Sequence, residues 1–138
     1  MTTSAFEFLK DNIGVTPFHK WLLPRLTNVD EQEHTVTIEL DIRPEMCRVE
    51  GRPDLHGGII SALIDITGHA AVAVKVRHNV ATIDMRVDYL RMASGTKIRA
   101  VGSIIKLGRT IAVVDIRLFD SQDRLVAVGR ASYVTANM

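Results

Sequence analysis

The sequence predicts an α+β protein in which a curled antiparallel sheet wraps around one long central helix. Three observations support this fold class. An alternating strand pattern precedes residues 59–76, that stretch is free of proline and apolar nearly all round, and four strand-like runs follow it. A helix that is apolar on most sides must be buried on most sides. A one-layer antiparallel sheet covers such a helix best by curling around it.

Residues 1–24 are expected to form an N-terminal cover of one or two helices. Phe6 and Phe8 begin a short apolar segment of nearly helical spacing, and Pro17 opens a second one that contains Trp21. Pro24 then ends this second segment, because proline cannot continue a helix. The aromatic side chains of the cover either close an apolar tunnel or simply cover the core.

The remaining elements follow from the alternation of apolar residues and from turn-forming residues. The first strand is expected over His34–Ile42, and residues 43–55, with two prolines and a glycine, are expected to form a loop. The central helix is expected over Ile59–Val76. Four strands are expected after it, joined by turn-like segments: Val80–Met92, Thr96–Leu107, Thr110–Asp120 and Arg124–Thr135.

Length and composition describe one folded domain over residues 1–138. Hydrophobic residues make up 46% of the chain and charged residues 24%, which excludes a disordered or fibrous protein. No repeat or linker divides the chain. The formal net charge of +1 supplies no strong field, so neither nucleic acid nor a membrane surface is expected as the main partner.

The cysteine and histidine content argues against a metal site. Cys47 is the only cysteine, so one chain can form neither a disulfide nor a thiolate metal cluster. The five histidines show no spacing typical of metal ligands. Residues 1–10 lack the basic start and the apolar run of a secretion signal, and we therefore expect a cytoplasmic protein.

A set of short motifs connects this fold to a known family. His56-Gly57-Gly58 is followed by Asp65, nine residues after the histidine. Three further segments agree: residues 82–85 (TIDM), 87–91 (VDYLR) and 106–109 (KLGR). Together these motifs resemble the hotdog-fold acyl-CoA thioesterases, in particular the branch named after the phenylacetate-pathway (PaaI-type) thioesterase. The resemblance implies a hotdog fold.

The resemblance also implies hydrolysis of an acyl-CoA thioester to the free acid and CoA. In this family the position of Asp65 is a general base on water or a nucleophile that forms a mixed anhydride, and the backbone N–H at Gly57 polarises the carbonyl. The physical reason is clear. Glycines at a helix start permit close approach, and the free N–H groups there can stabilise an oxyanion. No basic residue stands three or four positions from Asp65 to pair with it.

Other residues near the motif have two possible roles each. His56 either orients the catalytic loop or simply caps the helix. Thr82 corresponds to a family position that holds the attacking water, or it is an ordinary strand residue. Ser61, Asp65 and His69 share one helical stripe, so they could form a hydrogen-bond relay. Otherwise His69 is a core histidine with a satisfied ring nitrogen.

The resemblance places substrate-binding groups at Gly58, Glu50, Arg91, Lys106, Gly108 and Arg109. Cations at the pocket mouth suit the phosphates of CoA, although each could also be a solvated surface charge. Glu50 departs from relatives that carry Asn or Gln at this position. A carboxylate cannot donate a hydrogen bond as an amide does.

The implied assembly is a homodimer or homotetramer with the pocket at the subunit interface, where residues such as Thr82 come partly from the neighbouring chain. The reaction needs no metal or organic cofactor. A hotdog-fold enoyl-CoA hydratase or dehydratase is one alternative, but its Asp-x-Asn-x-x-His pattern is absent. A non-enzymatic acyl-CoA-binding protein is another, and it would not need Asp65. The N-terminal aromatic residues favour medium or long acyl chains over aryl acids.

Overall fold

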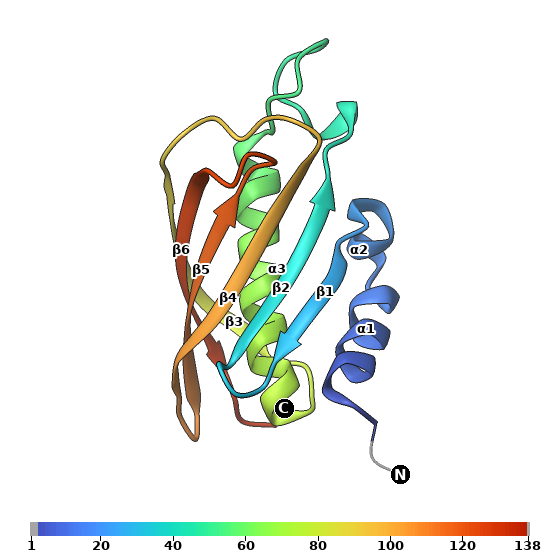
Figure 1. Cartoon of the computed structure of the whole chain (residues 1–138). Helices are drawn as coiled ribbons and strands as arrows, with labels where there is room; N and C mark the ends of the chain where they lie inside the picture. The colour runs from blue at the N-terminus through green and yellow to red at the C-terminus, as the bar shows by residue number, and fades with distance from the viewer. Residues whose placement is uncertain (1–2, 138) are drawn as a thin grey trace.

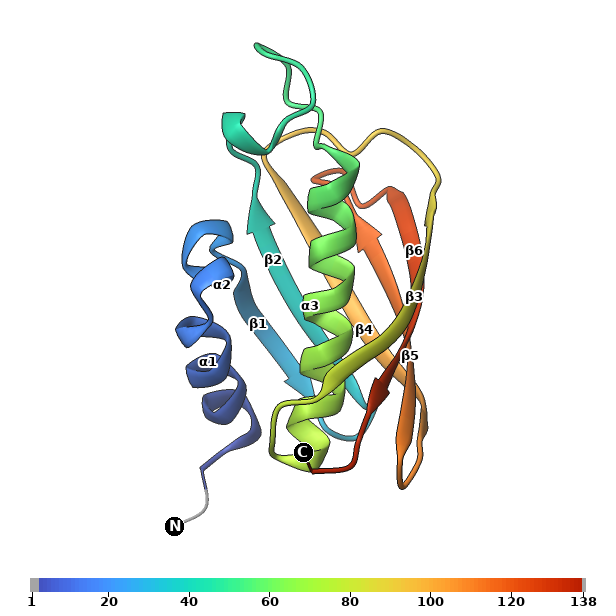
Figure 2. The same ribbon diagram turned by 180° about the vertical axis from the view of Figure 1, so that it is seen from behind.

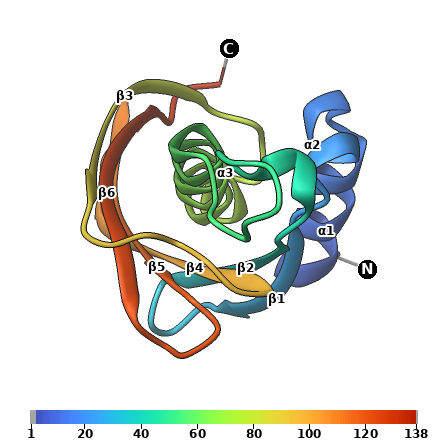
Figure 3. The same cartoon turned by 90° about the horizontal axis from the view of Figure 1, so that it is seen from above.

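The structure is a computed structural model that describes residues 3–137. Its elements are, in chain order, α1 (Ala5–Val15), α2 (Pro17–Leu22), β1 (Arg25–Asp30), β2 (Thr35–Asp41), a short 3-10 helix (Pro44–Met46), α3 (Gly57–Val76), β3 (Ala81–Tyr89), β4 (Lys97–Leu107), β5 (Ile111–Phe119) and β6 (Leu125–Val134). The six strands form one antiparallel sheet in the order β1-β2-β4-β5-β6-β3. This sheet curls around α3 (Figures 1 and 3), which confirms the predicted fold class.

The strand β1 is not among the predicted runs. It pairs only with β2, through a register shift between Leu26 and Asn28. Its other edge lies beside α1 (Figure 2). Only Leu26 and Val29 of this strand pack against the core, so β1 has too few apolar residues to show an alternating pattern.

The helix α3 begins two residues earlier than predicted and runs for 20 residues. The imidazole of His56 caps its start, and Arg77 ends it in the left-handed conformation with φ of 62°. The helix is long and apolar enough to cross a membrane by length and composition. Here the sheet buries most of it, so α3 is the core helix of this fold.

Two glycines of the sheet let α3 approach the strands closely. Gly102 on β4 faces Thr67, and Gly129 on β6 faces Ile64. A Cβ atom built on Gly129 would lie 2.6 Å from Ile64 Cγ2, which is far inside normal contact. The position of the helix, and therefore of the side chains it carries, depends on these small residues.

We expect Gly129→Ala to destabilise the protein by about 1–3 kcal/mol, because the added methyl overpacks the interface between helix and sheet. Gly14→Ala is the matched control. A Cβ there meets nothing within 4 Å, and alanine favours a helix over glycine by about 0.5–1 kcal/mol. Urea unfolding measures both changes. A Gly129→Ala variant as stable as the wild type would contradict the close packing described here.

The N-terminal helices cover the sheet near β1 and leave aromatic side chains on the outside. Leu9 and Leu22 are buried in the core, whereas the rings of Phe18 and Trp21 stack 6.2 Å apart and are almost half exposed. The guanidinium of Arg43 lies over the Trp21 ring and donates to the main-chain oxygen of Leu22. The loop that leads to α3 is thereby fixed to α2.

Candidate active site

The start of α3 presents one free backbone donor. The Nδ1 atom of His56 accepts a hydrogen bond from the Gly58 N–H at 2.8 Å, so this second amide is already used. The Gly57 N–H has no acceptor among residues 3–137. It lies at the positive end of the helix dipole, where a partial negative charge is stabilised. His56 therefore caps the helix, and Gly57 keeps its donor available.

A cavity of about 270 Å³ lies in front of Gly57. Its walls are mostly apolar, and two exposed arginines contribute to them; the lining residues are Arg48, Leu55, Gly57, Ile60, Tyr89, Leu90, Arg91, Met92 and Ala93. The hydroxyl of Tyr89 donates to the Gly57 main-chain oxygen at 3.1 Å and shares a 2.5 Å hydrogen bond with Ser61 Oγ. Among the predicted binding residues, Arg91 shares this cavity with Gly57.

The carboxylate of Asp65 is half-buried further along α3, and neutral donors hold it. Thr82 on β3 donates to Asp65 Oδ1 at 2.8 Å. Tyr133 on β6 donates to the same oxygen at 3.3 Å and to the Asp65 main-chain oxygen at 3.0 Å. No cation forms an ion pair with Asp65 in the described part of the chain. A carboxylate without a cationic partner remains free to act as a base or nucleophile.

The contact between Thr82 and Asp65 corrects one expectation. Thr82 is expected to come partly from the neighbouring subunit, but its hydrogen bond to Asp65 forms within one chain. The strand β3 follows α3 directly and passes alongside it, so both residues reach the same point. A register shift between Thr82 and Asp84 locally alters the pairing of β3 with β6.

The proposed relay along the helix stripe is not formed. Ser61 Oγ bonds to Tyr89, and His69 Nε2 accepts from the Val80 N–H at 3.4 Å, so neither residue bonds to Asp65. Burial lowers the pKa of His69, although the nearby charge of Asp65 acts in the opposite direction. His69 is therefore a neutral histidine of the core with a satisfied ring nitrogen.

The distance between the two candidate groups is decisive for the chemistry. Gly57 and Asp65 are eight residues apart on one straight helix, which is about 12 Å along the axis. A reacting carbonyl carbon and its oxygen need a nucleophile and a donor each about 3 Å away. One chain therefore carries two half-sites that cannot act on the same carbonyl.

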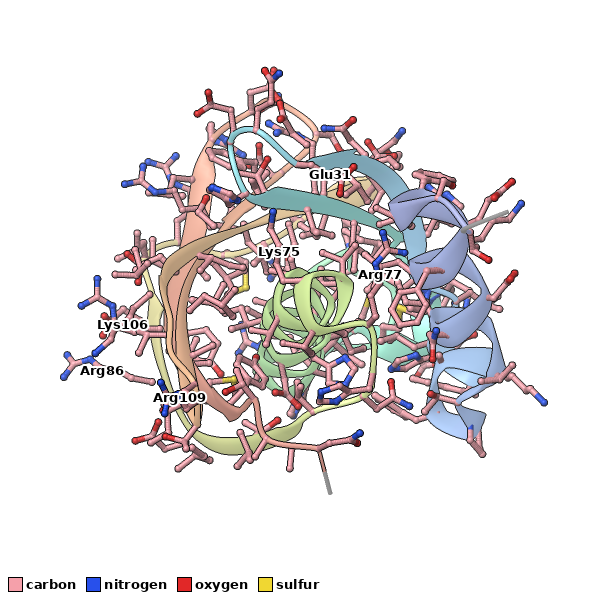
Figure 4. The ribbon with its side chains drawn as sticks, turned by 90° about the horizontal axis from the view of Figure 1, so that it is seen from below. Glu31, Lys75, Arg77, Arg86, Lys106 and Arg109 are labelled. Atoms are coloured by element: carbon pink, nitrogen blue, oxygen red, sulfur yellow. The ribbon has the colours of Figure 1, made fainter. Side chains whose placement is uncertain are left out.

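The other predicted binding residues are not gathered at Gly57. Glu50 lies on the exposed loop after the 3-10 helix and lines a separate cavity of about 550 Å³. Lys106, Gly108 and Arg109 belong to the β4–β5 hairpin, at the end of the molecule opposite to Gly57 (Figure 1). Figure 4 views the molecule from that end, with Lys106 and Arg109 at the sheet. The predicted CoA contacts thus do not meet within one chain.

Two tyrosines of the site were not singled out from the sequence. Tyr133 is fully buried, and its hydroxyl has both of its acceptors on Asp65. Tyr89 appeared only as part of a family motif, yet it packs against the helix start. The one available signal for Tyr133 is its inward position on a strand, since a buried tyrosine hydroxyl needs a partner.

Comparison with known proteins decides the family. The chain matches the family described as Thioesterase superfamily over residues 53–127, more than half of its length. The chain belongs to the thioesterase superfamily. A solved structure from this superfamily has a TM-score of 0.89 at 35% identity and covers 96% of this chain and 98% of its own. The PaaI protein from the phenylacetic acid degradation operon of Escherichia coli shares the fold, with a TM-score of 0.84 at 19% identity over 96% of this chain and 94% of its own. The resemblance to hotdog thioesterases seen in the sequence is confirmed.

Two curated proteins that are similar to this thioesterase-superfamily chain are named as an esterase and an acyl-CoA thioesterase. A candidate esterase of Halobacterium salinarum is 41% identical over 93 residues, which is 60% of this chain. The medium/long-chain acyl-CoA thioesterase YigI of Escherichia coli is 30% identical over 95 residues, which is 58% of this chain. Each alignment covers 61% of the relative. The chain thus spans about three fifths of the length of these relatives.

Proposed function

We propose that the protein hydrolyses acyl-CoA thioesters to a free carboxylic acid and CoA. The observation that carries this proposal is the combination, within residues 3–137, of a free Gly57 N–H at a helix start with an Asp65 carboxylate that no cation neutralises. Membership of the thioesterase superfamily supports the same reaction. A protein that only bound acyl-CoA would have no need to hold an uncompensated carboxylate in a half-buried position.

In the proposed reaction the two groups act on opposite parts of the thioester. The Gly57 N–H donates to the carbonyl oxygen, where negative charge grows in the transition state, and the helix dipole adds to this stabilisation. Asp65 either takes a proton from the attacking water or attacks the carbonyl carbon itself and forms a mixed anhydride. In both routes the carbon–sulfur bond breaks and the thiol of CoA leaves.

We infer that a complete site combines Gly57 of one subunit with Asp65 of a second copy. The exposed edge of β3 supports this assembly. Within the described residues no strand pairs with this edge, and Ile83 and Met85 of β3 are exposed. Pairing two β3 edges around a two-fold axis reverses the partner's α3. The same axis brings the partner's β4–β5 hairpin, with its Lys106 and Arg109 positions, toward the end that holds Gly57. A homodimer, alone or within a tetramer, then completes the site.

The proposed substrates are acyl-CoA esters with medium or long chains. Leu55, Ile60, Leu90 and Met92 give the cavity at Gly57 an apolar wall. The similarity to YigI, which is named for medium- and long-chain acyl-CoA, points in the same direction. Arg91 at the same cavity is available to the phosphates of CoA.

A panel of acyl-CoA esters of graded chain length, together with aryl-CoA esters, tests this function through the release of free thiol. We expect hydrolysis to be fastest for the medium or long chains. Faster hydrolysis of aryl-CoA esters would overturn the substrate class while leaving the reaction in place. No thiol release from any ester would overturn the reaction itself.

The assignment of Arg109 to the CoA phosphates gives a separate prediction. Arg109→Ala is expected to raise KM for CoA esters about fivefold, the effect of losing about 1 kcal/mol of charge-assisted contact. Short thioesters that lack the nucleotide should be unaffected, and the difference should shrink in high salt. Arg117→Ala, which removes an exposed arginine from β5, is the matched control. Equal effects of Arg109→Ala on both kinds of substrate would refute the assignment.

A further inference from the structure

We propose that Tyr133 is a positioning residue that holds Asp65 so that Oδ2 is the oxygen that reacts. This inference rests on the proposed thioesterase function. Tyr133 lies 68 positions after Asp65 in the sequence, on β6, the last strand of the chain. The two proposals can fail separately, as the experiment below allows.

Tyr133 and Thr82 act on Asp65 as a pair. They lie opposite each other in the register of β3 and β6, so their side chains meet on the inner face of the sheet. Both hydroxyls donate to Asp65 Oδ1, at 2.8 Å from Thr82 and 3.3 Å from Tyr133. Oδ2 accepts no hydrogen bond from any residue in the range 3–137. Oδ1 therefore accepts both hydrogen bonds, and the lone pairs of Oδ2 remain available to take a proton or to form a bond to carbon.

The Tyr133 hydroxyl acts only as a donor to this carboxylate. Burial raises the pKa of Tyr133 far above its ordinary value, and the charge of Asp65 acts in the same direction. The hydroxyl therefore stays protonated over the whole working range of pH. Its single proton is shared between two acceptors of the same residue, the Asp65 main-chain oxygen at 3.0 Å and Oδ1 at 3.3 Å. Both backbone and side chain of Asp65 are thereby held.

The helix is built to admit this hydroxyl. Gly68 lies one turn after Asp65, and a Cβ atom built on it would collide with the Tyr133 hydroxyl. A buried hydroxyl is costly unless it is hydrogen-bonded, and phenylalanine would fill the same space without that cost. The tyrosine therefore has a role that its ring alone does not fill, and both of its acceptors belong to Asp65.

In the proposed reaction, Oδ2 takes either a proton or the acyl group. The oxygen of water forms a bond to the thioester carbon while its proton passes to Oδ2 of Asp65. The carbon–sulfur bond then breaks, its electron pair stays on sulfur, and the proton on Oδ2 passes to the thiolate. On the anhydride route Oδ2 itself forms the bond to the acyl carbon, while the carbon–sulfur bond breaks and its electron pair leaves on the CoA sulfur. Water then adds to the acyl carbon and the bond from that carbon to Oδ2 breaks, which restores the Asp65 carboxylate. One proton of the water stays on the free acid and the other passes to the thiolate.

Tyr133→Phe tests the proposal, because it keeps the ring and removes only the donor. We expect kcat to fall about tenfold or more while KM stays nearly constant, since substrate binding does not involve this oxygen. Thr67→Val is the matched control. Thr67 is also fully buried, and its hydroxyl donates to a main-chain oxygen of α3, that of Leu63, instead of to Asp65. This control is expected to keep kcat within twofold of the wild type.

A second measurement does not depend on turnover. In protein with 13C-labelled aspartate carboxyl carbons, Asp65→Asn identifies the Asp65 signal in the NMR spectrum. We expect that signal to shift in Tyr133→Phe and to stay in place in Thr67→Val.

An unchanged kcat or an unchanged Asp65 signal in Tyr133→Phe would overturn the positioning role while the thioesterase function stands. An equal loss of kcat in Thr67→Val would assign the effect to the core instead. If the wild type hydrolyses no acyl-CoA ester but the NMR shift is present, the proposed function is overturned. The hydrogen bond between Tyr133 and Asp65 would then exist without a catalytic role.

Discussion

Asp65→Asn should lower kcat for acyl-CoA hydrolysis at least about a hundredfold and leave KM nearly unchanged. The amide keeps the shape of the side chain, and its oxygen can still accept from Thr82 and Tyr133. Its nitrogen then stands where Oδ2 stood and can neither take a proton nor attack a carbonyl. Thiol release at saturating substrate measures the loss.

Asp11→Asn, an exposed position on α1, is the control for the effect of changing one charge. It should retain full turnover. Asp65→Asn with a turnover within a few-fold of the wild type would remove Asp65 from the mechanism.

Gly57→Pro is expected to lower kcat about 10²–10³-fold, because proline lacks the N–H that stabilises the oxyanion. Proline is tolerated at the first position of a helix, so the fold should persist. The preceding residue also suits it, since His56 already has φ of −64° and ψ of 138°. Thermal unfolding confirms that the variant is folded, and thiol release measures its rate.

Gly57→Ala separates the loss of the donor from the loss of glycine. It keeps the N–H, and its methyl would lie 3.4 Å from the Tyr89 ring, which is ordinary contact. Its rate should fall less than about tenfold. Equal losses in the two variants would show that the space at Gly57, and not its N–H, supports the reaction.

Much of the fold could be predicted from the sequence because its signals are local. The central helix follows from its length and its apolar surface, and β4 to β6 follow from alternation between turn residues. The apolar, proline-free stretch begins at Ile59 and therefore predicts α3 from that residue. The helix begins at Gly57 because the cap by His56 outweighs the low helix propensity of the two glycines. The strand β1 was missed because its apolar positions are too few.

The residues of the candidate site that belong to a sequence motif could be predicted. The residues that meet only through the pairing of distant strands could not. Gly57 and Asp65 stand in one motif, so their roles follow from the family resemblance. Tyr133 reaches Asp65 only through the register of β6 with β3, which no local pattern encodes. The prediction that Thr82 comes partly from the neighbouring subunit is wrong for the same reason. The β4–β5 hairpin, which carries Arg109, lies at the opposite end of the molecule from the start of α3, and only the folded chain shows this.

Mixed dimers of Gly57→Pro and Asp65→Asn chains test the central claim, that Gly57 of one subunit acts with Asp65 of the other. Two different affinity tags allow the heterodimer to be purified away from both parent homodimers. In it, one site holds the intact Gly57 and the intact Asp65, and the other site holds both substitutions. The account predicts about half of the wild-type activity per dimer, although each parent is nearly inactive. A purified heterodimer as inactive as its parents would contradict the shared site, and so would a fully active monomer in sedimentation.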